Sequence, residues 1–355
     1  MNPFRLLVGG YYGCGNLGDD ALLYGLVESL RDKPVTCSVL SGDLELTQKT
    51  TSCPAISRMD FKGIQRALSE HDALVFGGGS LFQDVTSLRS VFYYALLILL
   101  AKRRQKKVIL LGQGVGPLRT PFGRVVTRWA FEKADAITVR DAESYAFLRK
   151  MKVSRPLEQT ADLVFLLRSV LSSLKVPKAD QGSTKIGFAP RISQGFGFQK
   201  CVDLFSELVL YCQKNGIEPL AIAMHHKEDS VIVDALKMQT GLTQLEGSDY
   251  LQGVFQQISA LDGMVAMRLH GGVFAVLQSV PVMMLSYDPK VTSFAKQLGL
   301  PFVDLEGPDV HEKLIQEFEV FLKQKETFSN VMKEKLDNIS TLSRRNIDFL
   351  FEHLS

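Results

Sequence analysis

Several features that identify common protein classes are scarce in this 355-residue sequence. The five cysteines contain no Cys-x-x-Cys pair, so the chain lacks the usual zinc-ribbon pattern and fits reduced thiols in a cytoplasmic protein. The formal net charge is only +3, which argues against nucleic-acid binding but leaves room for an anionic substrate or an anionic membrane surface. The most apolar run, residues 91–101, is well short of the roughly 20 residues of a membrane span, and no signal peptide is expected before the first strand.

Signature motifs of common enzymes are also missing. The sequence contains no Gly-x-Ser-x-Gly, no His-Glu-x-x-His and no protein-kinase motif set, which excludes the hydrolases, metalloproteases and kinases that depend on them. His225 and His226 are adjacent and therefore do not share one helical face, so we expect no metal site there. No cofactor and no other metal site are expected.

What the sequence does contain is a regular alternation of short apolar runs and helical patterns. This alternation predicts parallel sheets that are covered on both faces. The length exceeds that of one ordinary core, so we expect two domains. Predicted strands cover residues 5–8, 35–40, 73–76, 108–111 and 136–139, then 186–189, 219–223, 264–267 and 281–285. Predicted helices cover residues 17–30, 61–68, 88–102, 124–133 and 142–151, then 200–214, 230–238, 251–259, 273–279 and 291–298.

The predicted fold class is α/β, with two Rossmann-like, doubly wound domains that face a cleft, as in the glycosyltransferase-B architecture. We expect an N-terminal domain at residues 1–170, a linker at 171–184, a C-terminal domain at 185–325 and a helical tail at 326–355. The linker is placed where Ser, Lys, Pro and Gly accumulate and the apolar period fades. The tail is polar and is expected to pack back across both domains.

Residues 267–272 carry the strongest functional signal. Arg268 and His270 lie at a predicted strand-to-helix turn, where helix N–H groups and the helix dipole favour an anion. Gly271 lets backbone or ligand come close, and Lys290 adds a cation after the next strand. The alternative is that these are ordinary loop residues, but open α/β sheets place ligands at the carboxyl ends of their strands.

Three further glycine-rich loops follow predicted strands. The candidate ligand-binding residues in them are Gly13, Cys14, Gly15, Asn16, Asp20, Gly77, Gly78, Gly79, Asp84 and Gln113. Such loops cradle a phosphate or a carboxylate with exposed backbone donors, although the first is not a Walker A loop because no Gly-Lys-Ser/Thr follows. An alternative of equal weight is that Asp19 and Asp20 only cap a helix.

Arg140 ends the strand predicted at residues 136–139. Its planar guanidinium group can hold a carboxylate or a phosphate with two parallel hydrogen bonds. The alternative is a structural pair with Asp141 or a helix-capping arrangement.

These motifs, taken in order, resemble those of the polysaccharide pyruvyl transferase family of the CsaB type. They are GYYGCGNLGDDA, FGGGSLFQDVTSLRS, GQGVGP, VRD, MRLHGGVFA and SYDPKV, and they extend from Gly9 to about Leu300. Three features depart from the family pattern. Cys14 stands where an aromatic residue is common, GGGS and GDDA replace GGGG and GDEA, and Arg191 lies in a stretch without the expected aromatic neighbour.

The resemblance implies a glycosyltransferase-B-like enzyme that moves the pyruvyl group of phosphoenolpyruvate onto two hydroxyls of a sugar. The product is a pyruvate ketal, and phosphate is released. The implied acceptor is N-acetylmannosamine or another hexose of a cell-surface polysaccharide or its lipid-linked precursor. The family's donor-site positions carry over to Arg140, Arg268, Leu269 and His270, to which we add Lys290 and Gly271. The C-terminal domain is then the donor side, and the N-terminal domain is the acceptor side with part of the donor site.

In this scheme His270 is the hypothesised general acid, or the group that hydrogen-bonds the phosphate. Arg268 and Arg140 hold the donor and stabilise developing charge, while Asp20 and Asp84 are candidates for the base that activates the acceptor. The alternatives are a nucleotide-sugar-dependent glycosyltransferase and a non-catalytic polymer-binding protein. We expect no nucleic-acid partner and a cytoplasmic location, with peripheral association at the inner membrane face through the acceptor.

Overall fold

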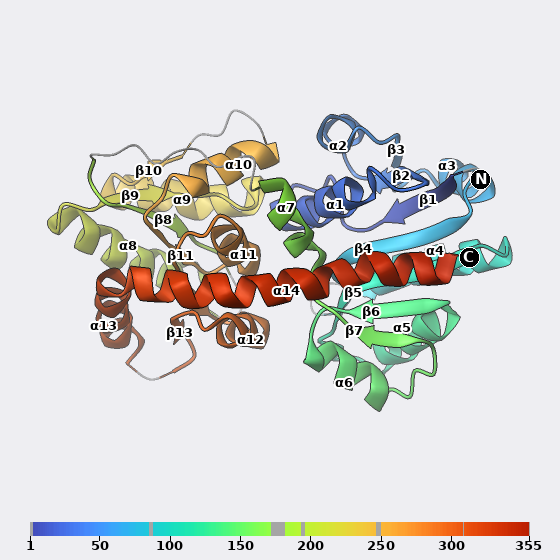
Figure 1. Ribbon diagram of the computed structural model, residues 1–355. Helices are drawn as coiled ribbons and strands as arrows, with labels where there is room; N and C mark the ends of the chain where they lie inside the picture. Colours follow the sequence, from blue (N-terminus) through green and yellow to red (C-terminus); the bar gives the residue numbers. More distant parts are fainter. Residues whose placement is uncertain are drawn as a thin grey trace. The chain divides into compact units, whose positions relative to one another are not determined.

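The computed structural model describes residues 3–84, 88–171, 182–192, 196–245, 250–307 and 309–354 (Figure 1). The chain divides into two compact units, and each is described by itself. Unit 1 contains Met1–Leu167 and Ile339–Ser355, and unit 2 contains Arg168–Asn338. Most of the expected linker, residues 171–184, lies outside the described residues, and the expected domain boundaries stay predictions.

Unit 1 is built on a parallel seven-stranded sheet with the order β3-β2-β1-β4-β5-β6-β7. Its strands are β1 (Phe4–Gly9), β2 (Val35–Ser41), β3 (Ala55–Ser57), β4 (Ala73–Phe82), β5 (Lys107–Val115), β6 (Ala136–Val139) and β7 (Leu157–Gln159). Its helices before residue 167 are α1 (Leu17–Leu30), α2 (Leu44–Thr51), α3 (Phe61–Glu70), α4 (Leu88–Arg103), α5 (Pro121–Lys133), α6 (Ala142–Lys150) and the 3-10 turn η1 (Leu163–Leu166). The short helix α7 (Leu167–Leu171) follows.

Unit 2 is built on a parallel six-stranded sheet with the order β10-β9-β8-β11-β12-β13. Its strands are β8 (Lys185–Ala189), β9 (Glu218–Ala221), β10 (Thr243–Gln244), β11 (Gly263–Ala266), β12 (Val282–Ser286) and β13 (Phe302–Asp304). Its helices are α8 (Phe198–Lys214), α9 (His226–Thr240), α10 (Tyr250–Ser259), α11 (Leu269–Leu277), α12 (Pro289–Leu298) and α13 (Val310–Lys323).

The continuous apolar runs become central strands because helices cover both faces of each sheet. In β1, the neighbours Leu6, Leu7 and Val8 point to alternate faces and all have 0% exposure. In β11, Met264 and Val265 are also fully buried. The prediction of two parallel α/β sheets is therefore confirmed.

Three sequence-based boundaries were wrong in a way that matters for function. The glycine runs at 77–79 and 112–114 were expected to be loops, but β4 continues to Phe82 and β5 to Val115, with pairs such as Gly79 to Gln113. Sheet hydrogen bonds use only the backbone, so glycine can still pair with a parallel neighbour. The helix expected from residue 273 begins at Leu269, which places His270 in its first turn.

The last helix, α14 (Lys325–Leu354), has 30 residues and is unbroken (Figure 1). Its residues up to Asn338 belong to unit 2, and those from Ile339 belong to unit 1. In unit 1, the fully buried Asn346 donates to the carbonyl of Ala161 at 3.0 Å and accepts from Thr160 at 2.8 Å. Within the described part of the chain, every helix is too short or too polar to cross a bilayer.

Candidate functional site

Each sheet reverses its strand order at one point, and α/β sheets bind ligands beside such points, at the carboxyl ends of the strands. In unit 1 the reversal lies between β1 and β4, and in unit 2 it lies between β8 and β11. The glycine-rich loop of unit 1 follows β1, the run at residues 77–79 lies in the second half of β4, and the Arg268–His270 turn of unit 2 follows β11. The sequence-predicted residues therefore collect at the carboxyl edge of their own sheet.

The glycine-rich loop after β1 is closed by the protein's own side chains. The N–H of Gly13, which has φ 63°, donates to Asp20 Oδ1 at 2.8 Å. Asn16, the N-cap of α1, accepts from the N–H of Gly18 at 3.2 Å. Two backbone donors expected for a phosphate are therefore used internally, beside buried carboxylates. This arrangement favours a ligand with hydroxyl groups over an anion at this loop.

Asp19, in the first turn of α1, has a perturbed carboxyl group. Asp19 and Asp20 are 9% and 6% exposed, and Asn16 Nδ2 donates to Asp19 Oδ2 at 2.5 Å. Burial, and then the charge of Asp20, raise the pKa of Asp19 to about 7, although Arg140 acts in the opposite direction. A carboxyl group with this pKa can take up and release a proton near neutral pH.

The glycines in β4 serve close packing of unit 1's own side chains. The hydroxyl of Tyr12 donates to the carbonyl of Gly77 at 2.8 Å, and a Cβ at Gly77 would lie 2.6 Å from that hydroxyl. Gly78 and Gly79 have φ 81° and 83°, and a Cβ at Gly79 would lie 3.0 Å from Asp19 Oδ1. Larger residues here would push Tyr12 and Asp19 away from the strand.

Arg140 is a buried cation held by carboxylates on two sides. Its Nη1 donates to Asp162 at 2.8 Å, its Nη2 donates to Ser80 at 3.1 Å, and Asp141 lies 3.5 Å from Nε. A Cβ at Gly114 would lie 2.8 Å from the guanidinium group, so glycine makes room for it. Burial disfavours the charged form, but Asp162 and Asp141 outweigh burial and raise the pKa of Arg140. The structural pair of Arg140 with Asp141, which was the alternative to a ligand-binding role, is therefore present. The role of Arg140 in binding a ligand stays a prediction.

Asp84 and Gln113 make structural contacts. The Asp84 carboxylate accepts from the N–H groups of Arg119 and Thr120 at 2.6 and 2.8 Å and from the Thr120 hydroxyl at 2.5 Å. Although burial acts in the opposite direction, these hydrogen bonds lower the pKa of Asp84, which makes it a weak base. The fully buried Gln113 donates its amide to three carbonyls of β4 and β5, at 3.1 to 3.3 Å.

Sequence reasoning missed Arg58, which directly follows β3. Its Nη1 donates to Cys14 Sγ at 3.1 Å, and its guanidinium carbon lies 5.1 Å and 5.0 Å from the ring centres of Tyr11 and Tyr93. No motif surrounds Arg58 in the sequence, and its partners come from distant segments. The unusual cysteine of the first loop was the only available signal.

In unit 2, Arg268 is the N-cap residue of α11 and is bound to two carboxylates. Its Nε and Nη2 donate to the fully buried Asp229 at 2.8 to 2.9 Å and 2.5 Å, and Nη2 also donates to Glu228 at 2.9 Å. Asp229 Oδ2 also accepts from the N–H groups of Met224 and His225 at 3.0 and 2.8 Å. One carboxylate therefore fixes both the loop after β9 and the position of Arg268.

The neighbours of Arg268 in α11 have separate roles. Leu269 and His270 are half-buried in the first turn, where backbone N–H groups of a helix are unsatisfied within the helix. A Cβ at Gly271 would lie 3.3 Å from the Cβ of Ala189. Packing of α11 against the sheet therefore accounts for Gly271, which we had expected at the donor.

Two further cations lie at the same edge of unit 2. Lys290, in the first turn of α12, has its Nζ 3.5 Å from Asp288 Oδ2. Arg191 Nη1 donates to the Tyr287 hydroxyl at 2.6 Å. Burial raises the pKa of Tyr287, and the charge of Arg191 acts in the opposite direction.

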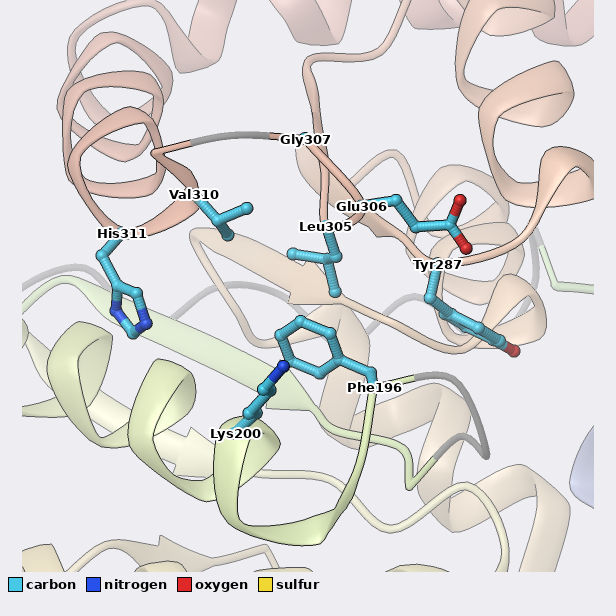
Figure 2. A pocket seen from close by; sticks show the side chains of 8 residues that line it. All are labelled: Phe196, Lys200, Tyr287, Leu305, Glu306, Gly307, Val310 and His311. Atoms are coloured by element: carbon cyan, nitrogen blue, oxygen red, sulfur yellow. The ribbon is translucent and has the colours of Figure 1, made fainter.

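A pocket of about 420 Å³ opens beside Tyr287 in unit 2 (Figure 2). Its lining comes from the start of α8, the segments after β12 and β13, and the start of α13. The lining residues are Phe196, Lys200, Tyr287, Leu305, Glu306, Gly307, Val310 and His311. Arg268 and His270 are not among them, so this pocket is a neighbour of the predicted donor residues rather than their container.

Among the residues that the structure describes, no group of three or more His, Cys, Asp or Glu side chains is placed to hold a metal ion.

Comparison with protein families adds what geometry alone does not supply. A family model described as polysaccharide pyruvyl transferase matches residues 16–289, which is most of the chain. The chain belongs to the polysaccharide pyruvyl transferase family. This pyruvyl transferase is therefore an enzyme of the transferase class, and its matched region contains Arg140, Arg268 and His270.

A curated relative of this pyruvyl transferase is the amylovoran biosynthesis protein AmsJ of Erwinia amylovora. The two are 22% identical over 367 aligned residues, which cover 84% of this chain and 86% of AmsJ. The name of that relative refers to amylovoran biosynthesis.

Solved structures similar to this pyruvyl transferase show the fold. The UDP-GlcNAc 2-epimerase of Neisseria meningitidis matches with a TM-score of 0.67 and 13% identity, over 98% of this chain and all of that one. Anabaena HepE in complex with UDP-glucose matches with a TM-score of 0.61 and 10% identity, over 98% of this chain and 99% of that one. A glycosyltransferase of Rickettsia africae matches with a TM-score of 0.61 and 12% identity, over the whole of both chains. The predicted glycosyltransferase-B-like fold class is confirmed.

Proposed function

We propose that this enzyme transfers the pyruvyl group of phosphoenolpyruvate onto two hydroxyls of a sugar and releases phosphate. The observation that carries the proposal is the family match together with Arg268, Leu269 and His270 at the start of α11. Phosphoenolpyruvate carries a carboxylate and a phosphate, so its binding needs converging cations and N–H donors. Arg268 is already oriented by Asp229 for such a role.

The reaction needs a proton at the methylene carbon of the donor. We assign this step to His270, which in protonated form sits beside donors suited to an anion. Protonation gives the adjacent carbon oxocarbenium character, and a sugar hydroxyl attacks there and loses its proton. The carbon–oxygen bond to phosphate then breaks, and a second hydroxyl of the same sugar attacks that carbon, loses its proton and closes the ketal.

Arg140 and Arg268 supply fixed positive charge to the donor in this proposal. Each is held by buried carboxylates, so its orientation does not depend on the ligand. A charge that is positioned before the reaction stabilises the transition state without reorganisation.

Asp19 is the better candidate for the base that activates the acceptor. Of the two candidates inferred from sequence, Asp84 is fully engaged by Thr120 and Arg119 and has a lowered pKa. Asp20 accepts from Gly13 and stands beside Asp19. The pKa of Asp19, about 7, suits proton transfer near neutral pH.

The acceptor and the place of action are part of the proposal. We propose a hexose such as N-acetylmannosamine in a cell-surface polysaccharide or in its lipid-linked precursor, as in CsaB-type enzymes. Such a precursor would bring the enzyme to the cytoplasmic face of the membrane. The relation to AmsJ, whose name refers to amylovoran biosynthesis, supports an acceptor of this kind.

Thermal stability in the presence of phosphoenolpyruvate, beside UDP- and GDP-sugars, tests the donor, because a ligand of the folded state raises its melting temperature. We expect stabilisation by phosphoenolpyruvate and its loss in Arg268→Ala. In phosphate-release assays, His270→Ala should lower turnover about 10²- to 10⁴-fold, while His311→Ala, an exposed histidine of the same unit, should not. Stabilisation by a nucleotide sugar alone would replace the proposal with a nucleotide-sugar glycosyltransferase.

A further inference from the structure

Arg58 differs from Arg140 and Arg268 in having no carboxylate partner. Arg140 and Arg268 each bind acidic side chains within 3.0 Å. Arg58 is half-buried, and among the residues that the structure describes no carboxylate lies within ion-pair distance of it. Charges that are removed from water are normally paired. A half-buried arginine without a carboxylate partner is therefore suited to binding an anionic ligand.

The contacts of Arg58 are all with neutral groups. Its guanidinium group lies over the ring of Tyr11 and over the ring of Tyr93, and it donates to Cys14 Sγ. The Cys14 thiol donates in turn to the carbonyl of Tyr12 at 3.4 Å, and burial raises the pKa of Cys14. The sulfur is therefore a neutral thiol, and it does not cancel the positive charge.

A buried polar group beside Arg58 also lacks a partner. The side chain of Tyr94 is 2% exposed, and its hydroxyl has no hydrogen-bond partner in the described part of the chain. Burial raises the pKa of Tyr94, and Arg58 is close enough to act in the opposite direction. An unsatisfied buried hydroxyl is unfavourable unless a ligand completes it. The guanidinium group without a carboxylate and the buried Tyr94 hydroxyl thus lie at one place in unit 1.

We propose that Arg58, which contacts the rings of Tyr11 and Tyr93, binds an anionic group carried by the acceptor sugar. The acceptor is then an acidic sugar, with a carboxylate or a phosphate on or next to the hexose that is modified. This assignment of the ligand as acceptor rests on the proposed function. We refer to Tyr11, Arg58, Tyr93 and Cys14 as the Arg58 clamp.

The surroundings of the Arg58 clamp favour the acceptor over the donor. The start of α1 presents Asp19 and Asp20, whose carboxyl oxygens accept hydrogen bonds from sugar hydroxyls but would repel a donor with two anionic groups. Arg58 contacts Cys14, and the adjacent Gly13 donates its N–H to Asp20 at 2.8 Å, so the loop after β1 joins Arg58 to the start of α1. Tyr11 is 41% exposed, and an aromatic ring offers a flat apolar face to a sugar ring. Carboxyl groups that accept from sugar hydroxyls, an aromatic face for the sugar ring and a cation for its anionic group together match an acidic sugar.

Calorimetric titration without phosphoenolpyruvate tests the Arg58 clamp directly. The probes are a hexose 1-phosphate, a hexuronate, the neutral hexose and inorganic phosphate. We expect one of the two acidic sugars to bind more tightly than the neutral hexose, which identifies the group as phosphate or carboxylate. Arg58→Gln should weaken that acidic sugar about 10- to 100-fold, the range for a lost charge-assisted hydrogen bond, and leave the neutral hexose unchanged.

Three further variants separate binding from folding. Arg58→Lys keeps the charge but loses the planar group, so it should recover only part of the affinity. Tyr11→Leu should weaken acidic and neutral hexoses alike. Arg5→Gln is the matched control, since Arg5 is an exposed arginine near the start of β1, at the opposite edge of the same sheet; it should change nothing. Equal affinity of acidic and neutral hexoses, or no loss in Arg58→Gln, would overturn the proposal, as would inorganic phosphate binding as tightly as the hexose 1-phosphate.

The donor is titrated in parallel so that the two proposals fail separately. Stabilisation by phosphoenolpyruvate should be the same in the unsubstituted protein and in Arg58→Gln. If it is lost in Arg58→Gln, Arg58 belongs to the donor site and the acceptor assignment is wrong. If phosphoenolpyruvate does not bind even to the unsubstituted protein, the proposed function fails, whereas the sugar titrations still decide whether Arg58 binds an anion.

Discussion

Replacing Asp229 by asparagine should destabilise unit 2 far more than its conservative shape suggests. The side chain is fully buried and accepts from Arg268 and from the N–H groups of Met224 and His225. An amide has one acceptor oxygen, so in either orientation its NH₂ group would face donors. Arg268, which is 7% exposed, would keep only its contact with Glu228. Breaking a buried ion pair on one side costs about 3 to 5 kcal/mol.

The neighbouring carboxylate offers a matched comparison. Glu228 binds the same guanidinium group at 2.9 Å, but its side chain is 60% exposed. Glu228→Gln should therefore cost less than about 1 kcal/mol, the range of solvent-exposed pairs. The same chemical change thus has two expected sizes, which differ only because of burial.

Denaturation by urea, followed by two signals, measures both effects. The single tryptophan, Trp129 in α5, belongs to unit 1, so its fluorescence reports on unit 1, while circular dichroism reports on both units. Asp229→Asn should shift the circular-dichroism transition and abolish stabilisation by phosphoenolpyruvate. A loss of less than 1 kcal/mol in the free energy of unfolding, equal to that of Glu228→Gln, would refute the reasoning that Asp229 is a buried counter-ion.

Two further predictions concern unit 1. Because the pKa of Asp19 is raised from 3.8 to about 7, the folded state retains a proton that the unfolded chain has released, so stability should fall as pH rises from 4 to 7. Asp19→Asn should remove this fall, which is at most about 4 kcal/mol, and abolish turnover; a parallel pH dependence of thermal stability in the variant would contradict the assignment. Asn346→Ala should cost about 2 to 4 kcal/mol in unit 1, because it leaves the buried Thr160 and Ala161 groups unsatisfied. Tryptophan fluorescence during urea denaturation should show this loss, and an unchanged midpoint would mean that α14 contributes little to unit 1.

Much of the fold could be predicted because long apolar and amphipathic runs dominate it. The first helix, Leu17–Leu30, was predicted with the bounds that the structure shows. Strands β3, β7, β10 and β13 were missed because each has only two or three residues and lies at an edge of its sheet. The glycine runs were misplaced into loops because composition does not reveal that a parallel neighbour continues beside β4.

The candidate site divides in the same way. Arg140 and Arg268 were found because they follow strands, and their roles at the donor stay predictions. Their partners were not predicted: Asp229 is 39 residues from Arg268 in the sequence, and Asp162 is 22 residues from Arg140. Arg58 carries no local pattern at all. Contacts between distant segments decide which cations are neutralised within the protein and which are left for a ligand.

The helix α14 has a consequence for how the protein is made. Asp162 binds Arg140 through its side chain, and its backbone carbonyl accepts from the hydroxyl of Ser343, in α14, at 2.8 Å. Residues 339–354 thus complete a unit whose other members were synthesised first. During translation, unit 1 cannot complete its fold until residues 339–354 have left the ribosome, and these are synthesised after all of unit 2. A fragment that ends at residue 167 would therefore lack Ser343 and Asn346, whose side chains bind the segment after β7 that carries Asp162.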